Sequence, residues 1–155
     1  MTENELFSRR PLGMRMAMVV RQWRAAIDHA LRDTGITQSS WTVLMQLQQL
    51  GENVSVSELA EVQGIELPPL MRTLALLEKR ELIARTTSPY DKRIRLLALT
   101  LKGCALLEKI TQVIEACQRQ ATENIPAEDL QKFSATLSQL ACNLRVMREE
   151  DNKTE

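Results

Sequence analysis

The side chains best suited to chemistry are basic residues gathered in one part of the chain. Between residues 70 and 95 there are seven Lys and Arg against three Asp and Glu, whereas acidic residues outnumber basic ones from Glu108 onward. The formal net charge of the 155 residues is zero, so no global field attracts the protein to nucleic acid. A local basic segment is the footprint of a DNA-binding surface. A solvated helix end would explain Lys79 and Arg80, but not the cluster Asp91-Lys92-Arg93.

Other chemistries find little support in the sequence. There is no nucleophile–base pair, glycine-rich phosphate loop or paired ligand motif, so we expect neither an enzyme nor a cofactor. His29 is the only histidine and has no partners at ligand spacing, which makes a metal site unexpected. The three cysteines form no CxxC pair, and Cys104, inside a predicted helix, is expected to be buried. We expect no membrane partner and a cytoplasmic protein with reduced thiols, because arginines interrupt the apolar residues near the N-terminus.

A helix, a turn and a second helix are predicted to position the basic residues. Ser55 and Glu58 have the spacing of a capping box, so one helix begins there and ends near Gly64. Pro68 and Pro69 suit only the first turn of the second helix, because proline fixes φ and lacks an N–H. The apolar residues of the second helix recur at helical spacing and predict a buried stripe: Leu67, Leu70, Met71, Leu74 and Leu77.

Side chains off that stripe face outward and are candidates for DNA contact. Arg72 can fork onto the O6 and N7 atoms of a guanine, although a phosphate contact or a surface salt bridge is the alternative. Thr73 lies beside it. Leu76, one turn further on, either touches a thymine methyl group or is half-buried.

Two β-rich runs follow, residues 82–87 and 94–99, around a loop that contains Pro89. This pattern predicts a β-hairpin, and with the two helices it gives a winged helix-turn-helix. In an extended loop Asp91 and Arg93 point to one side and pair, while Lys92 points to the other and projects from the tip. Such a tip can reach a minor groove, where narrow A·T tracts concentrate negative potential.

Long helices flank this unit. Helices are predicted before Gly35, from Thr37 to Gly51, from Thr100 onward and again after Pro126. The unit is too small to cover all their apolar faces, so we expect a second copy to do so, with a monomeric bundle as the alternative. The residues expected at this dimer interface are Met16, Val20, Leu130, Phe133, Leu137, Leu140, Leu144 and Met147.

The segment from Ile83 to Gly103 resembles the wing of MarR-family regulators. Their pattern, roughly D-x-R and then L-T-x-x-G, is matched by Asp91-Lys92-Arg93 and Leu99-Thr100-Leu101-Lys102-Gly103. Residues 23–31 and Met71-Arg72-Thr73-Leu74 look most like the SlyA group, and the similarity runs from about Arg15 to Leu144. Departures from the family pattern are Pro69 where the SlyA group tends to carry Ser, Glu81 in place of the usual Gly, and the apolar Leu96 and Ala98.

This resemblance implies a mostly α fold with a small β-hairpin wing and a helical dimerisation region. It implies a homodimeric repressor or activator that binds double-stranded DNA at a pseudo-palindromic operator. It also implies binding of small aromatic acids such as salicylate, for which Trp23, His29, Trp41 and Arg72 are candidates. The alternative is that the tryptophans are core residues and His29 a solvated helix end. The residues predicted to contact DNA are Pro68, Pro69, Arg72, Thr73, Leu76, Arg85, Asp91, Lys92, Arg93 and Arg95.

We therefore expect one module with five parts. The competing function is a helical protein-interaction module that does not bind DNA, but such a module would not need the basic hairpin loop. The expected parts are a flexible N-terminal arm (1–10), a dimerisation helix (11–34), a DNA-binding lobe (36–100), C-terminal dimerisation helices (101–148) and a flexible tail (149–155).

Overall fold

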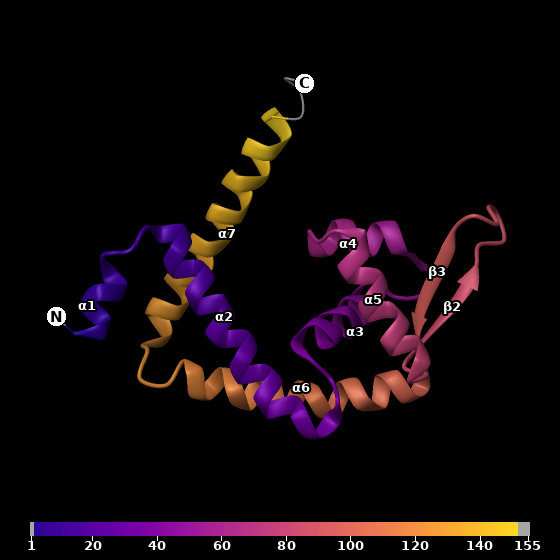
Figure 1. Cartoon of the computed structure of the whole chain (residues 1–155), viewed down its shortest axis with the longest axis horizontal. Helices are drawn as coiled ribbons and strands as arrows, with labels where there is room; N and C mark the ends of the chain where they lie inside the picture. Colours follow the sequence, from indigo (N-terminus) through magenta and orange to yellow (C-terminus); the bar gives the residue numbers. More distant parts are fainter. Residues whose placement is uncertain (1, 152–155) are drawn as a thin grey trace. The chain divides into compact units, whose positions relative to one another are not determined.

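The computed structural model describes residues 2–151 and is mostly helical, with one small sheet (Figure 1). The chain divides into two compact units, Met1–Gln118 and Arg119–Glu155. The elements, in chain order, are α1 (Glu3–Ser8), α2 (Leu12–Leu31), a short 3-10 helix η1 (Arg32–Thr34), α3 (Gln38–Leu50), β1 (Val54–Ser55), α4 (Val56–Gln63), α5 (Leu67–Lys79), β2 (Ile83–Thr87), β3 (Arg95–Leu99), α6 (Leu101–Ala121) and α7 (Ala127–Asp151).

The predicted helix boundaries are confirmed by their caps. The Thr37 hydroxyl accepts a hydrogen bond from the Ser40 amide at the start of α3, and the Ser55 hydroxyl accepts one from the Glu58 amide at the start of α4. Gly64 ends α4 in the left-handed conformation, as expected for a helix C-cap.

One hydrophobic core holds the first unit together. It is built from the inward faces of α2 to α6 and from the sheet. Most of the apolar residues that helical spacing predicts to face the core do so. Leu67 and Met71 are corrections: both are exposed, because the buried stripe of α5 begins at Leu70. The fully buried side chains are Ile27, Leu31, Leu44, Leu47, Leu59, Leu70, Leu74, Leu77, Leu82, Leu97, Leu107 and Ile110.

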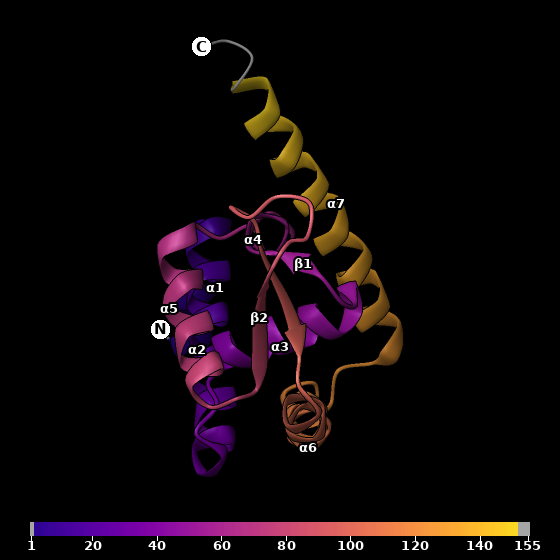
Figure 2. The same cartoon turned by 90° about the vertical axis from the view of Figure 1, so that its right-hand side faces the viewer.

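The sheet has three antiparallel strands in the order β1-β3-β2, where the sequence predicts two (Figure 2). The hairpin β2–β3 is confirmed, with Ile83 opposite Leu99 and Thr87 opposite Arg95. The added strand β1 has only two residues, and its Val54 pairs with Leu97. Its effect is to tie the turn before α4 to the wing.

The junction between α5, β2 and α6 explains two features of the sequence. Glu81 has φ 59°, so this residue, not a glycine, provides the left-handed position that ends α5. The Leu82 amide then donates to the Leu77 carbonyl at 3.0 Å, which completes a Schellman-type end. Thr100 caps α6: its hydroxyl accepts from the Gly103 amide at 3.0 Å and donates to the Glu81 carbonyl at 2.7 Å.

Gly103 lets α6 approach the start of β2 closely. A Cβ atom at this position would lie 2.0 Å from the Leu82 carbonyl oxygen, far inside van der Waals contact. The same oxygen accepts the Thr100 amide at 3.1 Å. The L-T-x-x-G pattern therefore forms the junction between the wing and α6. The threonine caps the helix, and the glycine leaves room for the backbone of Leu82.

Three expectations need correction. Residues 3–8 of the expected flexible arm form α1, which has a capping box between Thr2 and Glu5. Residues 149–151 of the expected tail continue α7, whereas residues 152–155 lie outside the described residues. Cys104 is exposed and not buried, because it lies on the face of α6 that points away from the core.

Candidate nucleic-acid interface

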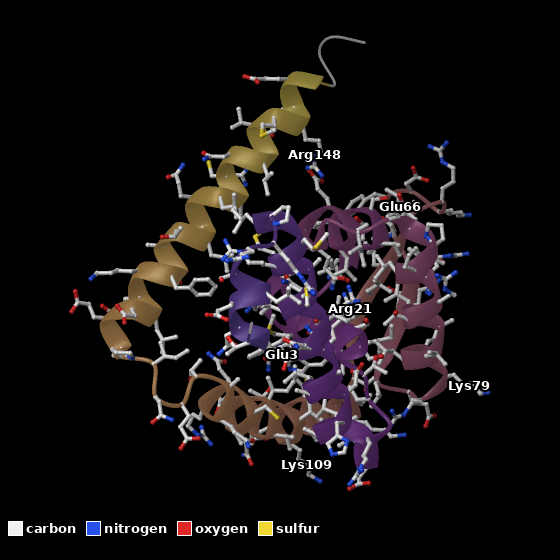
Figure 3. The ribbon with its side chains drawn as sticks, turned by 60° about the vertical axis from the view of Figure 1, so that its left-hand side comes forward. Glu3, Arg21, Glu66, Lys79, Lys109 and Arg148 are labelled. Atoms are coloured by element: carbon white, nitrogen blue, oxygen red, sulfur yellow. The ribbon has the colours of Figure 1, made fainter. Side chains whose placement is uncertain are left out.

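Helix α5 presents one face that the core does not use. Its start follows from Glu66 at the N-cap and from the prolines in its first turn. The inward residues Leu70, Leu74 and Leu77 orient the helix, so that the opposite face is open to solvent. In Figure 3 the labels Glu66 and Lys79 mark the two ends of α5.

The predicted contact residues of α5 lie on this open face. Pro68, Pro69 and Arg72 are exposed, and Thr73 is half-buried with its hydroxyl donating to the Pro69 carbonyl at 3.3 Å. Leu76 is 61% exposed, so it is not the half-buried residue of the second alternative. The Arg72 guanidinium forms no hydrogen bond or ion pair with another residue in the range 2–151, so it is available to a ligand.

The wing carries the pair expected from the sequence. Arg93 Nη2 lies 3.0 Å from Asp91 Oδ2, and Arg93 Nε donates to Asp91 Oδ1 at 3.2 Å. The Arg93 side chain, and then its backbone amide at 2.9 Å, hold the pKa of the Asp91 carboxyl below its usual range. Lys92 is exposed between them.

The geometry behind this pair differs from the expected one. The loop is not extended at this point, since residues 92 and 93 form a turn closed by a 3.0 Å bond from the Ile94 amide to the Asp91 carbonyl. At the base of the loop, the Ser88 amide donates to the Ile94 carbonyl at 2.9 Å, and the buried Ser88 hydroxyl accepts from the Tyr90 amide at 3.2 Å. The Arg93 side chain is also 90% exposed, so it presents charge as well as shaping the loop.

The two remaining arginines of the predicted set have different surroundings. Arg85 on β2 is only 19% exposed and pairs with Glu78 of α5 at 3.4 Å, so it links the wing to the helix. Arg95 on β3 is exposed, and its guanidinium donates to the Thr87 hydroxyl across the hairpin. The structure thus places Arg95 on the surface with Lys92 and Arg93 but turns Arg85 inward.

One exposed wing residue was missed. Tyr90 is 98% exposed in the loop that holds Asp91, and Ile94 is exposed at the other end of the same turn. The sequence could have predicted this exposure, because Tyr90 lies between Pro89 and Asp91 in the loop, where the core does not cover a side chain.

The chain is similar to known transcriptional regulators. A model of the MarR family matches residues 34–94, from the last residue of η1 to the residue before β3. The structure is similar to a MarR-family transcriptional regulator from Rhodococcus sp. RHA1, with 26% identity and a TM-score of 0.78 over 84% of this chain and 91% of the other. Its fold is the winged-helix fold found in MarR-family regulators. It is also similar to a mutant E. coli MarR in complex with operator DNA, with 26% identity and a TM-score of 0.78 over 84% of this chain and 93% of that one.

A third similar structure contains a bound small molecule. CouR from Rhodococcus jostii RHA1, bound to p-coumaroyl-CoA, is 25% identical with a TM-score of 0.76 over 87% of this chain and 94% of CouR. In the present chain, Trp23 and Trp41 are half-buried against the core, while His29 and Arg72 are exposed on α2 and α5. None of these four residues lines the hollows described below.

A different hollow lies among α2, α3, α4 and α5 and has a volume of about 410 Å³. Two of its polar atoms, Gln38 Oε1 and Gln63 Nε2, are buried and have no hydrogen-bond partner. Unpaired buried amides are costly, and a bound polar group would satisfy them. Arg24, Thr42, Pro69 and Thr73 also line this Gln38–Gln63 hollow, so it borders the interface helix α5.

The residues expected at a dimer interface are largely uncovered in the single chain. In α7, Phe133, Leu137, Leu144 and Met147 are exposed, and no residue between 119 and 150 is buried. Leu130 and Leu140 are half-buried; on α2, Met16 is half-buried and Val20 exposed.

The described part of the chain contains neither a candidate metal site nor a candidate membrane-spanning helix. Within residues 2–151 no three His, Cys, Asp or Glu side chains are grouped to hold a metal ion. No helix in the same range combines the length and apolar character needed to cross a membrane.

Proposed function

We propose that this protein is a DNA-binding regulator of the MarR family that acts as a homodimer on a pseudo-palindromic operator. The open face of α5 enters the major groove, and the wing reaches the adjacent minor groove. The observation that carries the proposal is that Arg72 on α5 and the cations of the wing belong to one compact unit and are exposed outside its core.

The contacts divide by their chemistry. Arg72 is placed to read a guanine, and the exposed Leu76 supplies an apolar contact of the kind that a thymine methyl accepts. Pro68, Pro69 and Thr73 shape the start of the helix against the backbone. Lys92, Arg93 and Arg95 of the wing neutralise phosphates or enter a narrow minor groove.

Dimerisation is part of the proposal because α7 has no core of its own. A helix of 25 residues with an apolar stripe needs a partner surface, and its unit contains no buried residue among those described. A two-fold axis covers such a stripe with its own copy and places two α5 helices on half-sites about one helical turn apart.

Salt-dependent DNA binding tests the proposal directly. Fluorescence anisotropy with a labelled duplex would measure Kd between 50 and 200 mM salt. A regulator that makes several phosphate contacts loses about 10³-fold or more in affinity over this range. Absence of binding, or binding that salt does not change, would instead favour the alternative of a protein-interaction module.

We further propose that small aromatic acids such as salicylate modulate DNA binding from the Gln38–Gln63 hollow. The Arg24 guanidinium can pair with a carboxylate, and the two unpaired amides can bond the hydroxyl and carbonyl groups of the ligand. If Trp23, His29, Trp41 and Arg72 form the site instead, Trp41→Phe will change the salicylate response and Gln63→Leu will not.

The finer assignments rest on resemblance. We propose membership of the SlyA-like subgroup on the segments at residues 23–31 and 71–74. A regulator of this kind works beside its operator in the cytoplasm as a repressor or an activator, and no enzymatic role belongs to the proposal.

A further inference from the structure

A second hollow lies at the opposite end of α5 from the DNA-facing prolines. It has a volume of about 370 Å³ and is lined by Arg80, Leu82, Lys102, Ala105, Leu106 and Lys109. We call it the Lys102–Lys109 hollow. Because α5 has 13 residues, its two ends are about 20 Å apart, so this hollow stays off the DNA when the start of α5 is in the groove. Figure 3 labels Lys109 on α6, with Lys79 at the nearer end of α5.

Two of the three cations around this hollow, Arg80 and Lys109, are not balanced by a carboxylate of the described chain. The Arg80 guanidinium is fixed in place because it donates to the Gly35 carbonyl at 2.8 Å and to the Thr34 carbonyl at 2.9 Å, both neutral groups. Neither Arg80 nor Lys109 has an ion-pair partner among residues 2–151. Lys102 pairs with Glu81 at 3.5 Å, but both side chains are exposed, and such pairs exchange readily.

The spacing of the lining residues matches a helix. Lys102 and Lys109 are seven residues apart on one face of α6, which places them about 10 Å apart along its axis. Ala105 and Leu106 lie between them, and with the buried Leu82 they form an apolar floor. A groove with this pattern receives side chains that a partner helix presents at positions i, i+3, i+4 and i+7.

An exposed apolar side chain near the hollow favours a docking surface for a protein over a site for a simple ion. Leu101 is 91% exposed one turn before Ala105, so α6 carries a large apolar side chain near the floor residues that the described chain does not cover. A phosphate backbone needs cations but no apolar floor, which argues against DNA as the occupant.

We propose that the Lys102–Lys109 hollow docks an acidic amphipathic helix of a partner protein. The helix presents a carboxylate at each end, seven residues apart, to Lys102 and Lys109. Its two central apolar side chains lie on the floor formed by Leu82, Ala105 and Leu106. Docking here lets a protein bound at its operator hold a second protein, and it does not depend on the DNA contacts of α5.

A defined peptide tests this surface. The probe is a fluorescein-labelled helical peptide with an Ala/Gln scaffold, two Glu residues seven apart and two Leu residues between them. Anisotropy with the full chain, with and without bound DNA, should give a Kd of about 10–100 μM, as expected for a small interface. Versions with Lys for Glu, or with Ala for both Leu, should not bind wild type.

The variants separate this site from general attraction. Lys109→Glu should weaken binding by about five- to tenfold and should bind the Lys-containing peptide better than wild type does. Lys132→Glu, which makes the same change of charge in α7, should change binding by less than about twofold. Ala105→Glu, at an exposed floor position, should abolish binding while the melting temperature is kept.

Several results would overturn the proposal. They are failure of wild type to bind the acidic peptide, equal losses in Lys109→Glu and Lys132→Glu, and undiminished binding by Ala105→Glu. If Lys109→Glu lowers DNA affinity and the peptide does not bind, the hollow is a DNA contact. Because DNA binding is measured in the same samples, failure of this proposal is distinguishable from failure of the DNA-binding function.

Discussion

Replacing Gly103 by alanine tests the joint between the wing and α6. In an ordinary helix position, alanine is more favourable than glycine by about 1 kcal/mol, so propensity alone predicts that the variant is more stable. The contact predicts the reverse: the new Cβ would lie 2.0 Å from the Leu82 oxygen, so one of the two backbones must move by about 1 Å.

The size of the effect follows from two terms. Forcing extra volume into a packed site costs about 1–3 kcal/mol, and loss of the bond from the Thr100 amide to the Leu82 carbonyl costs about 0.5–1.5 kcal/mol. After the helix propensity is subtracted, we expect Gly103→Ala to destabilise the protein by about 1–3 kcal/mol. For a chain of this size that lowers Tm by about 3–10 °C.

Gly13→Ala is the matched control. Gly13 also lies in a helix, but its added Cβ would meet nothing within 4 Å. We expect this variant to be as stable as wild type or slightly more stable. Thermal melting of both variants by circular dichroism, together with DNA affinity, measures the difference. If Gly103→Ala melts at or above Gly13→Ala, the close approach is not a constraint, and our account of the L-T-x-x-G pattern is refuted.

Four further predictions concern the proposed DNA-binding dimer. Leu137→Glu should place a charge in the proposed dimer interface at a cost of several kcal/mol, and so lower both Tm and DNA affinity; a variant that sediments as a normal dimer and binds normally would remove the argument. Arg72→Ala should cost about 1–3 kcal/mol on a cognate operator and much less on random DNA, whereas equal losses would make Arg72 a phosphate contact. In the wing, Lys92→Arg should strengthen binding on A·T-rich flanks and Arg93→Ala should weaken binding everywhere; the roles are reversed if Arg93→Ala alone abolishes the flank preference. Since the pKa of Asp91 is lowered, its pair with Arg93 should keep the loop's shape above about pH 4 and lose it as pH falls further, so DNA affinity between pH 5 and 8 should not depend on this group.

Helix ends and short-range side-chain pairs could be predicted from the sequence, because they depend on residues close together in the chain. Helix starts at Thr37 and Thr100 and the helix end at Gly64 each depend on residues within one turn. The Asp91–Arg93 pair was predicted for the same reason, although the turn at residues 92 and 93 forms it, and not an extended strand. Helix α1 could also have been predicted, since Thr2 and Glu5 have capping-box spacing. It was missed because residues 3–8 show no apolar stripe at helical spacing.

Contacts between residues far apart in the chain could not be predicted from the sequence in this way. Arg85 belongs to the basic segment by sequence, yet its charge is directed to Glu78 on a different element. Strand β1 exists only because Val54 and Ser55 meet β3, since two residues have too little length to show alternation. The exposure of Cys104 depends on which face of α6 the lobe covers, and several faces of that helix are apolar.

These long-range contacts make α5 and the wing one body. Arg85 joins β2 to α5, Glu81 ends α5 in a conformation that sends the chain into β2, and the Thr100 hydroxyl binds the Glu81 carbonyl. The spacing between α5 and the wing loop is therefore set by contacts within the protein. It follows that a ligand beside α5, as proposed for the Gln38–Gln63 hollow, acts most effectively by moving helix and wing together relative to α2 and α3. In a dimer, such a movement changes the distance between the two half-site readers, and DNA affinity depends on that distance.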